Sequence, residues 1–131
     1  MASKIAIVGV GEVGGAAAYA LILHNVCATL LLVDKRSSHR DGQVKDLRGS
    51  TFKEQSGAHV QAATFREAAQ ADIVVITAAA KRGIGETTLQ YLYRSTATLR
   101  NIIESIKPFK RDGILLIPRM ANIALARATS Y

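Results

Sequence analysis

The most constraining feature of this sequence is a group of glycines between an apolar segment and a helix-forming segment near the N-terminus. The group is Gly9-Val10-Gly11-Glu12-Val13-Gly14, and it directly follows the apolar residues 5–8. Small residues typical of a closely packed helix occupy 16–23. A second apolar strand then ends at Asp34, twenty residues after Gly14. This order of strand, glycine turn, helix, strand and acid is typical of sites that bind a dinucleotide.

Each glycine has a physical reason to be where it is. Gly9 can adopt a tight turn, Gly11 has no side chain to block a pyrophosphate, and Gly14 lets the helix approach the strand. The helix start, with Glu12 and Val13, offers unpaired N–H groups and a partial positive charge to phosphates. Three glycines at this spacing also occur in ordinary solvated turns, so the prediction depends on the whole ordered pattern.

The acid at the end of the second strand bears on the choice of cofactor. The carboxylate of Asp34 can accept hydrogen bonds from the adenosine ribose. A negative charge there would repel the additional phosphate of NADP, which favours NAD. Lys35 and Arg36 follow directly and weaken that argument, because both are cationic.

Composition indicates one globular domain without a specialised partner. The chain has 131 residues, is 49% hydrophobic and carries a formal charge of +7. The basic residues are scattered, so no nucleic-acid partner is expected. The single cysteine, Cys27, is predicted to be buried and inert. No Cys/His cluster has metal-ligand spacing, and no apolar run approaches the roughly 20 residues of a membrane span; a cytoplasmic location is expected.

Strand and helix patterns alternate along the chain. Strands are predicted over residues 4–8, 28–33, 59–63, 72–77 and 114–117. Helices are predicted over residues 13–24, 40–51, 65–70, 87–108 and 121–128. The long helix has apolar residues at spacings of three and four, namely Leu89, Leu92, Thr96, Leu99, Ile103 and Ile106. Such alternation implies an α/β, Rossmann-type doubly wound parallel sheet with strand order 3-2-1-4-5.

Taken together, these motifs resemble the N-terminal half of the lactate/malate dehydrogenase family. The resemblance covers nearly all of residues 4–117 and includes 4–14, 30–34, Asp46-Leu47, 71–78 and Gly85-Glu86-Thr87. Family members move a hydride between NAD and the 2-carbon of a small hydroxy acid, commonly as dimers or tetramers. The resemblance therefore implies a cofactor-binding domain over residues 1–117, without the family's substrate domain.

Positions carried over from the family add to the predicted cofactor site. Thr77, Ala78 and Ala79 resemble the backbone segment beside the cofactor, where the family usually has Gly in place of Ala79. Arg82 falls at the family's specificity position and could pair with a second carboxylate of a substrate such as malate or oxaloacetate. The alternative is that Arg82 is a solvated loop charge. Thr88 occupies the position of the family's catalytic loop arginine, and Thr cannot supply its positive charge.

The end of the chain departs from the family pattern. Met120 stands where the family has an Asn near the nicotinamide, and Asn122 comes two residues late. We expect 118–131 to be a divergent tail with a short helix. The family's histidine acid/base and carboxylate-binding arginine belong to its second half. His24, His39 and His59 do not replace them, so no catalytic residue is predicted.

Three functional hypotheses follow. The chain is the NAD-binding half of a 2-hydroxy-acid dehydrogenase that is inactive alone, a non-enzymatic NAD-binding or interaction module, or a truncated product without stable function. The expected partners are NAD and, if a complementary half is supplied, a small 2-hydroxy or 2-oxo acid. The last predicted strand would leave an apolar sheet edge, which makes a homo-oligomer plausible.

Overall fold

Nine helices and strands alternate in the computed structural model, which describes residues 4–53, 57–78 and 83–117. In chain order they are β1 (Lys4–Val8), α1 (Glu12–Leu23), β2 (Thr29–Val33), α2 (Ser37–Lys53), β3 (His59–Ala62), α3 (Phe65–Ala68), β4 (Ile73–Ile76), α4 (Thr88–Ile106) and β5 (Ile114–Leu116). These are the predicted elements with small shifts at their ends. The largest shift is at α2, which begins at Ser37 and not at residue 40. The helix predicted over 121–128 lies outside the described residues.

The strands form one parallel sheet in the order β3-β2-β1-β4-β5, which confirms the predicted topology. The central strand β1 pairs with β2 on one side and β4 on the other, so that Ile5 lies opposite Leu30 and Ile73. A central strand covered on both faces needs apolar side chains at successive positions. This explains why β1 and β2 are almost continuously apolar.

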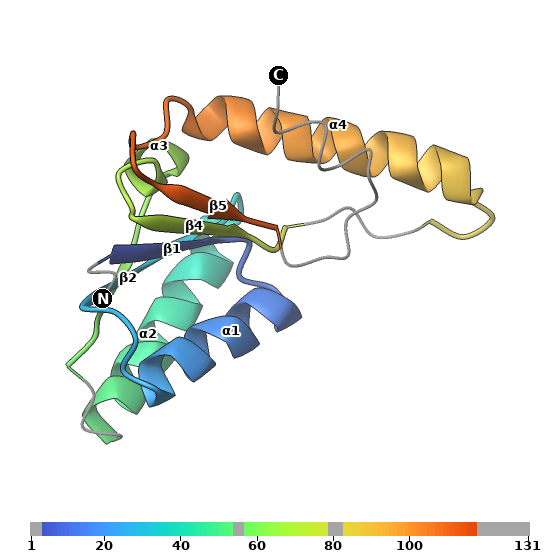
Figure 1. Cartoon of the computed structure of the whole chain (residues 1–131). Helices are drawn as coiled ribbons and strands as arrows, with labels where there is room; N and C mark the ends of the chain where they lie inside the picture. The colour runs from blue at the N-terminus through green and yellow to red at the C-terminus, as the bar shows by residue number, and fades with distance from the viewer. Residues whose placement is uncertain (1–3, 54–56, 79–82, 118–131) are drawn as a thin grey trace.

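Helices cover both faces of the sheet, with α1 and α2 on one face and α3 and α4 on the other (Figure 1). Successive residues of β1 face opposite sides, as the pleat requires. Ile5 and Ile7 belong to the core beneath α1 and α2, whereas Ala6 and Val8 belong to the core beneath α3 and α4. Cys27 is buried in the first core, as predicted, and burial raises the pKa of its thiol.

Helix α4 packs on the sheet from Ser95 onward and not over its first two turns. Its buried residues are Ser95, Leu99, Ile102, Ile103 and Ile106. The predicted apolar stripe begins too early, because Leu89 is 76% exposed where the first turns of α4 extend beyond the sheet (Figure 1). Across the described residues, neither α4 nor any other helix combines the length and apolar character needed to cross a membrane.

Candidate dinucleotide-binding site

The glycine turn between β1 and α1 lies where the strand order reverses, since β1 is flanked by β2 and β4. Crevices for ligands form at this point, outside the carboxyl ends of the strands. Gly9 has a φ of +97° and donates its backbone N–H to the carbonyl of Val33 at 2.7 Å. A Cβ at Gly9 would lie 2.6 Å from the backbone nitrogen of Ala78. Both backbone conformation and space therefore require glycine here.

The other two glycines of the motif have opposite surroundings. A Cβ at Gly14 would overlap the carbonyl oxygen of Gly9 and lie 2.7 Å from the Thr77 hydroxyl oxygen. Gly14 thus lets α1 press against the turn. A Cβ at Gly11 would meet no atom within 4 Å. Packing within the protein therefore does not require glycine at position 11. The open space beside Gly11 fits the close approach of a pyrophosphate.

The first turn of α1 faces this open space. Gly11 is the N-cap and makes no side-chain capping bond, and the helix continues through Glu12, Val13 and Gly14. The N–H of Gly15 donates to the carbonyl of Gly11 at 2.8 Å. The N–H groups that precede this bond have no partner within an α-helix and carry the positive end of its dipole. Glu12 and Val13 are exposed, so their side chains leave the backbone of the turn accessible.

The carboxyl end of β4 is bonded to the same turn. The Thr77 hydroxyl donates to the carbonyl of Gly9 at 2.5 Å, and its backbone N–H donates to the carbonyl of Val8 at 2.9 Å. The N–H of Ala78 also donates to Val8, at 3.1 Å. Thr77 and Ala78 therefore lie beside the glycines and hold the turn in place. Ala79 and Arg82 lie outside the described residues.

Asp34 follows β2 and turns its carboxylate toward the glycine turn. Its Oδ2 accepts a hydrogen bond from the backbone N–H of Val10 at 3.0 Å, and its Oδ1 accepts one from the backbone N–H of Arg36 at 2.9 Å. The side chain of Asp34 is only 8% exposed. The predicted acid and the predicted glycines are therefore joined by hydrogen bonds at the carboxyl ends of β1 and β2.

The carboxylate of Asp34 is stabilised in its charged form. Burial by itself raises the pKa of Asp34, but hydrogen bonds from Arg36 and Val10 and the charge of Arg36 outweigh it. The net result is a pKa below the ordinary value of an aspartate. At neutral pH the group is an acceptor only, which suits hydrogen bonding to hydroxyl groups.

Two further residues contribute to this structure and were not predicted as site residues. The guanidinium of Arg36 donates to both carboxylate oxygens of Asp34, at 3.3 and 3.4 Å. The Nε2 atom of His39 lies 2.7 Å from the carbonyl oxygen of Val10. Because a carbonyl only accepts, Nε2 must carry the proton in this contact. The adjacency of Arg36 to the acid was visible in the sequence, whereas no spacing rule indicates His39.

The remaining two histidines lie away from the turn. His24 caps the end of α1, and His59 begins β3; both are exposed. Neither is adjacent to the glycine motif or to Asp34 in the sheet order. Among the described histidines, His39 is therefore the one that contacts the glycine turn.

The Gly85-Glu86-Thr87 motif forms the entry to α4. Glu86 receives two hydrogen bonds from the guanidinium of Arg94, at 2.8 and 2.9 Å, and accepts the N–H of Gly83 at 2.9 Å. Thr87 is the N-cap of α4 and forms a reciprocal capping box with Gln90. Such caps typically contribute about 1 kcal/mol to helix stability. Thr88 is the first residue of the helix.

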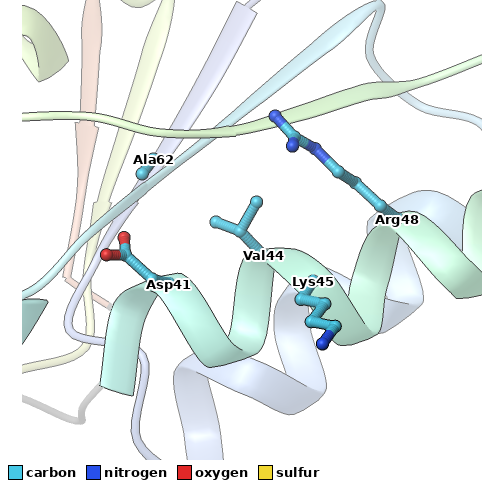
Figure 2. A pocket seen from close by; sticks show the side chains of 5 residues that line it. All are labelled: Asp41, Val44, Lys45, Arg48 and Ala62. Atoms are coloured by element: carbon cyan, nitrogen blue, oxygen red, sulfur yellow. The ribbon is translucent and has the colours of Figure 1, made fainter. Parts of the chain in front are cut away.

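A separate cavity of about 310 Å³ lies between α2 and β3 (Figure 2). Its lining residues are Asp41, Val44, Lys45, Arg48 and Ala62. Arg48 donates its Nε–H to the carbonyl of Val60 at 2.8 Å, which ties α2 to the sheet. None of the lining residues belongs to the predicted cofactor site. The cavity is therefore a feature of helix packing and not part of the glycine crevice.

The fold and the glycine crevice together define a dinucleotide-binding domain. Whether these residues fit a dinucleotide can be judged from the space beside each glycine. Protein atoms occupy the position of a Cβ at Gly9 and at Gly14, whereas the same position at Gly11 is open. A pyrophosphate would be held by the N–H groups of the first turn of α1, and the adenosine ribose by Asp34. These residues fit an adenine dinucleotide.

Comparisons with known proteins agree with this classification. The family model for the NAD-binding domain of lactate/malate dehydrogenase matches residues 3–123. L-lactate dehydrogenase A of Rhizopus oryzae is 39% identical over 115 residues, which are 88% of this chain and 35% of that protein. An L-lactate dehydrogenase of Clostridium botulinum is 34% identical over 116 residues, 88% of this chain and 36% of that protein.

Solved structures give the same result. A lactate dehydrogenase from a Medee basin deep-sea metagenome library superposes with a TM-score of 0.89 at 26% identity, over 99% of this chain and 43% of that one. The malate dehydrogenase of Picrophilus torridus shares the fold, with a TM-score of 0.87 at 19% identity, over 99% of this chain and 43% of that one. The chain belongs to the family of lactate/malate dehydrogenase NAD-binding domains. It spans about a third of the length of the curated relatives that it matches.

Proposed function

We propose that this chain binds NAD as the cofactor half of a 2-hydroxy-acid dehydrogenase. The observation that supports this most directly is the joint geometry of Gly11 and Asp34. Open space and unpaired helix N–H groups lie at one end of the turn, and a charged carboxylate lies at the other. When bound, NAD would supply the hydride acceptor, and the residues of this chain would bind and orient it.

The test is titration of the purified full chain with NADH, followed by calorimetry or by NADH fluorescence. Saturable binding at one site per chain is expected. Asp34→Ala should weaken binding, because the ribose hydroxyls lose their charged acceptor. Glu104→Ala is a matched control, since it removes an exposed carboxylate on α4, far from the glycine turn in the chain and the fold. Affinity unchanged in Asp34→Ala would contradict the ribose assignment.

The proposed reaction of a completed enzyme is hydride transfer between NAD and the 2-carbon of a small 2-hydroxy or 2-oxo acid. The sequence relatives reported above are L-lactate dehydrogenases, which favours a monocarboxylate. Arg82 favours a dicarboxylate such as oxaloacetate, because a guanidinium pairs bidentately with a second carboxylate. Turnover of NADH with pyruvate and with oxaloacetate, after a complementary catalytic half is supplied, distinguishes the two.

We further propose that the 131-residue chain has no dehydrogenase activity alone. Thr88 cannot replace a cationic loop residue. His24 and His59 lie away from the glycine turn, and the Nε2–H of His39 is held by the carbonyl of Val10. General acid/base catalysis typically contributes 10²–10⁴-fold, and no described residue supplies it. Loss of NADH absorbance with either substrate, abolished by Asp34→Ala, would contradict this proposal.

The second candidate function is a non-enzymatic NAD-binding module that self-associates. It is favoured by β5, which lies at the edge of the sheet and carries Ile114 and Leu116 half exposed. Exposed apolar edge strands tend to pair with other chains. Analytical ultracentrifugation should then show a dimer that Leu116→Lys converts to a monomer. A wild-type monomer at high concentration would exclude this role for the edge.

A further inference from the structure

The carboxylate of Asp34 is surrounded by four hydrogen-bond donors of the protein. Oδ1 accepts from the backbone N–H of Arg36 at 2.9 Å and from its Nε–H at 3.3 Å. Oδ2 accepts from the backbone N–H of Val10 at 3.0 Å and from Arg36 Nη2 at 3.4 Å. A carboxylate offers about four lone-pair positions. A ribose hydroxyl can therefore donate to Asp34 only after the guanidinium of Arg36 has moved away.

The guanidinium is the part of this arrangement that can leave. Its two bonds are the longest of the four, and the side chain of Arg36 is 64% exposed. Ion pairs with an exposed partner are typically worth no more than about 1 kcal/mol. The two shorter bonds come from the backbone and hold the carboxylate by themselves. Arg36 can thus exchange partners without disturbing Asp34 or the turn.

We propose that Arg36 recognises a phosphate on the 2′-position of the adenosine ribose, so that this site accepts NADP(H) as well as NAD(H). The inference rests on the proposed cofactor-binding function and extends it to the choice of cofactor. A bare carboxylate at the end of β2 would repel a 2′-phosphate. Arg36 neutralises that carboxylate, and a planar guanidinium pairs bidentately with phosphate oxygens.

The two cofactors would use the same residues differently. With NAD(H), the ribose hydroxyls replace the guanidinium on Asp34, and Arg36 extends into solvent. With NADP(H), the guanidinium stays beside Asp34 and neutralises it, and its remaining N–H groups pair with the 2′-phosphate. Arg36 thus competes with the ribose of one cofactor and binds the phosphate of the other, so that its removal should change the two affinities in opposite directions.

The experiment is titration of the full chain with NADH and with NADPH, by calorimetry, for the wild type, Arg36→Met and Lys35→Met. Methionine keeps an unbranched side chain and removes the charge. Lys35→Met is the matched control, because it removes an adjacent exposed charge that has no hydrogen bond to Asp34 among the contacts described. Arg36→Lys keeps the charge and loses the planar fork.

The wild type is expected to bind both cofactors. Arg36→Met should weaken NADPH binding at least about tenfold, the value of one charge-assisted hydrogen bond, and leave NADH binding equal or tighter. Lys35→Met should change both affinities by a similar factor, and Arg36→Lys should bind NADPH with intermediate affinity. The thermal unfolding midpoint of each variant verifies that it is folded.

Four outcomes would overturn the inference. If the wild type binds NADH but not NADPH, or if Arg36→Met changes both affinities by one factor, Arg36 does not select the cofactor and the proposed function stands. If Lys35→Met and Arg36→Met lower NADPH affinity alike, the effect is general charge. If the wild type binds neither cofactor, the proposed function itself is wrong.

Discussion

Replacing each of three glycines at the start of α1 by alanine should separate the needs of the fold from those of the ligand. Gly11, Gly14 and Gly15 lie within five residues, and the chemical change is one methyl group at each. Their surroundings differ completely. The added methyl would meet nothing at Gly11, the backbone of the turn at Gly14, and only the flexible side chain of Gln43, at 3.6 Å, at Gly15.

The expected stabilities follow from these distances. Gly14→Ala gains up to about 1 kcal/mol of helix propensity, but the methyl overlaps backbone that cannot rotate away, and overpacking costs about 1–3 kcal/mol or more. Because the added methyl carbon would overlap the carbonyl oxygen of Gly9, the cost is at or above the upper end of that range, and we expect a net loss of about 2 kcal/mol or more. Gly15→Ala keeps the propensity gain and should be stabilised by about 0.5–1 kcal/mol. Gly11→Ala should change stability by less than about 1 kcal/mol, because alanine is a poorer N-cap but also restricts the unfolded chain.

Ligand binding should follow a different order. The methyl in Gly11→Ala enters the space that a pyrophosphate would occupy and separates it from the N–H groups of α1. Loss of one hydrogen bond to a charged group costs about 1.5–3 kcal/mol, which is roughly a 10- to 100-fold loss of NADH affinity. Gly15→Ala should bind NADH like the wild type, since its methyl points toward Gln43 and not into the crevice.

Urea denaturation gives the free energies of unfolding, and NADH titration gives the affinities. For a chain of this size, 1 kcal/mol corresponds to roughly 3–5 °C in the unfolding midpoint, which is readily measured. Gly14→Ala as stable as Gly15→Ala would refute the packing argument. Gly11→Ala with wild-type NADH affinity would refute the placement of the pyrophosphate.

The remaining predictions concern charge, burial and exposure. Asp34→Asn should lower stability at pH 7 by about 1–3 kcal/mol, because the folded-state pKa of Asp34 lies below its ordinary value. The greater stability of the wild type is complete above the unfolded-state pKa of about 3.9 and disappears as the pH falls through the folded-state pKa. Urea denaturation between pH 7 and pH 3 should therefore show the free energies of unfolding of the two proteins converging. A difference that stays constant with pH would contradict this. The buried Cys27 thiol, whose pKa is raised, should react with iodoacetamide much more slowly in the native than in the urea-unfolded chain, and equal rates would show that it is accessible. In urea denaturation, Ile103→Ala should lower the free energy of unfolding by about 2–5 kcal/mol and Leu89→Ala by less than about 0.5 kcal/mol. The reason is that the Ile103 side chain is buried whereas that of Leu89 is exposed. Similar losses in the two variants would mean that the start of α4 is buried by other residues.

The sequence predicted the parts of the fold that depend on local pattern and on parallel-sheet topology. Continuous apolar runs identified β1 and β2, and the alternation of strands and helices led to the observed strand order. The stripe on α4 was predicted to begin at Leu89, which is exposed. Periodicity reports which residues share a helix face, but not where the sheet beneath that helix ends.

The site was predictable where a residue type has a steric reason and less so where it depends on tertiary contact. A motif rule distinguishes the roles of Gly9, Gly11 and Gly14, and the surrounding atoms agree with it. His39 reaches the carbonyl of Val10 across 29 positions in the chain, a contact that no local pattern encodes. The hydrogen bonds from the guanidinium of Arg36 to Asp34 likewise depend on the conformation of the Arg36 side chain, which the sequence does not specify.

The hydrogen bonds of the turn limit where cofactor selectivity can arise. The backbone of Gly9 is bonded to β2 and Thr77, and that of Val10 to Asp34 and His39, so changing these partners alters the turn itself. Gly11 and the guanidinium of Arg36 are different, because a Cβ added at Gly11 would meet no atom within 4 Å and the guanidinium makes only long, exposed bonds. These are the positions at which a substitution can change the ligand without unfolding the crevice. Selectivity between dinucleotides is therefore expected to vary most easily at the ribose end, through Arg36, because any side chain at Gly11 obstructs the pyrophosphate that all dinucleotides share.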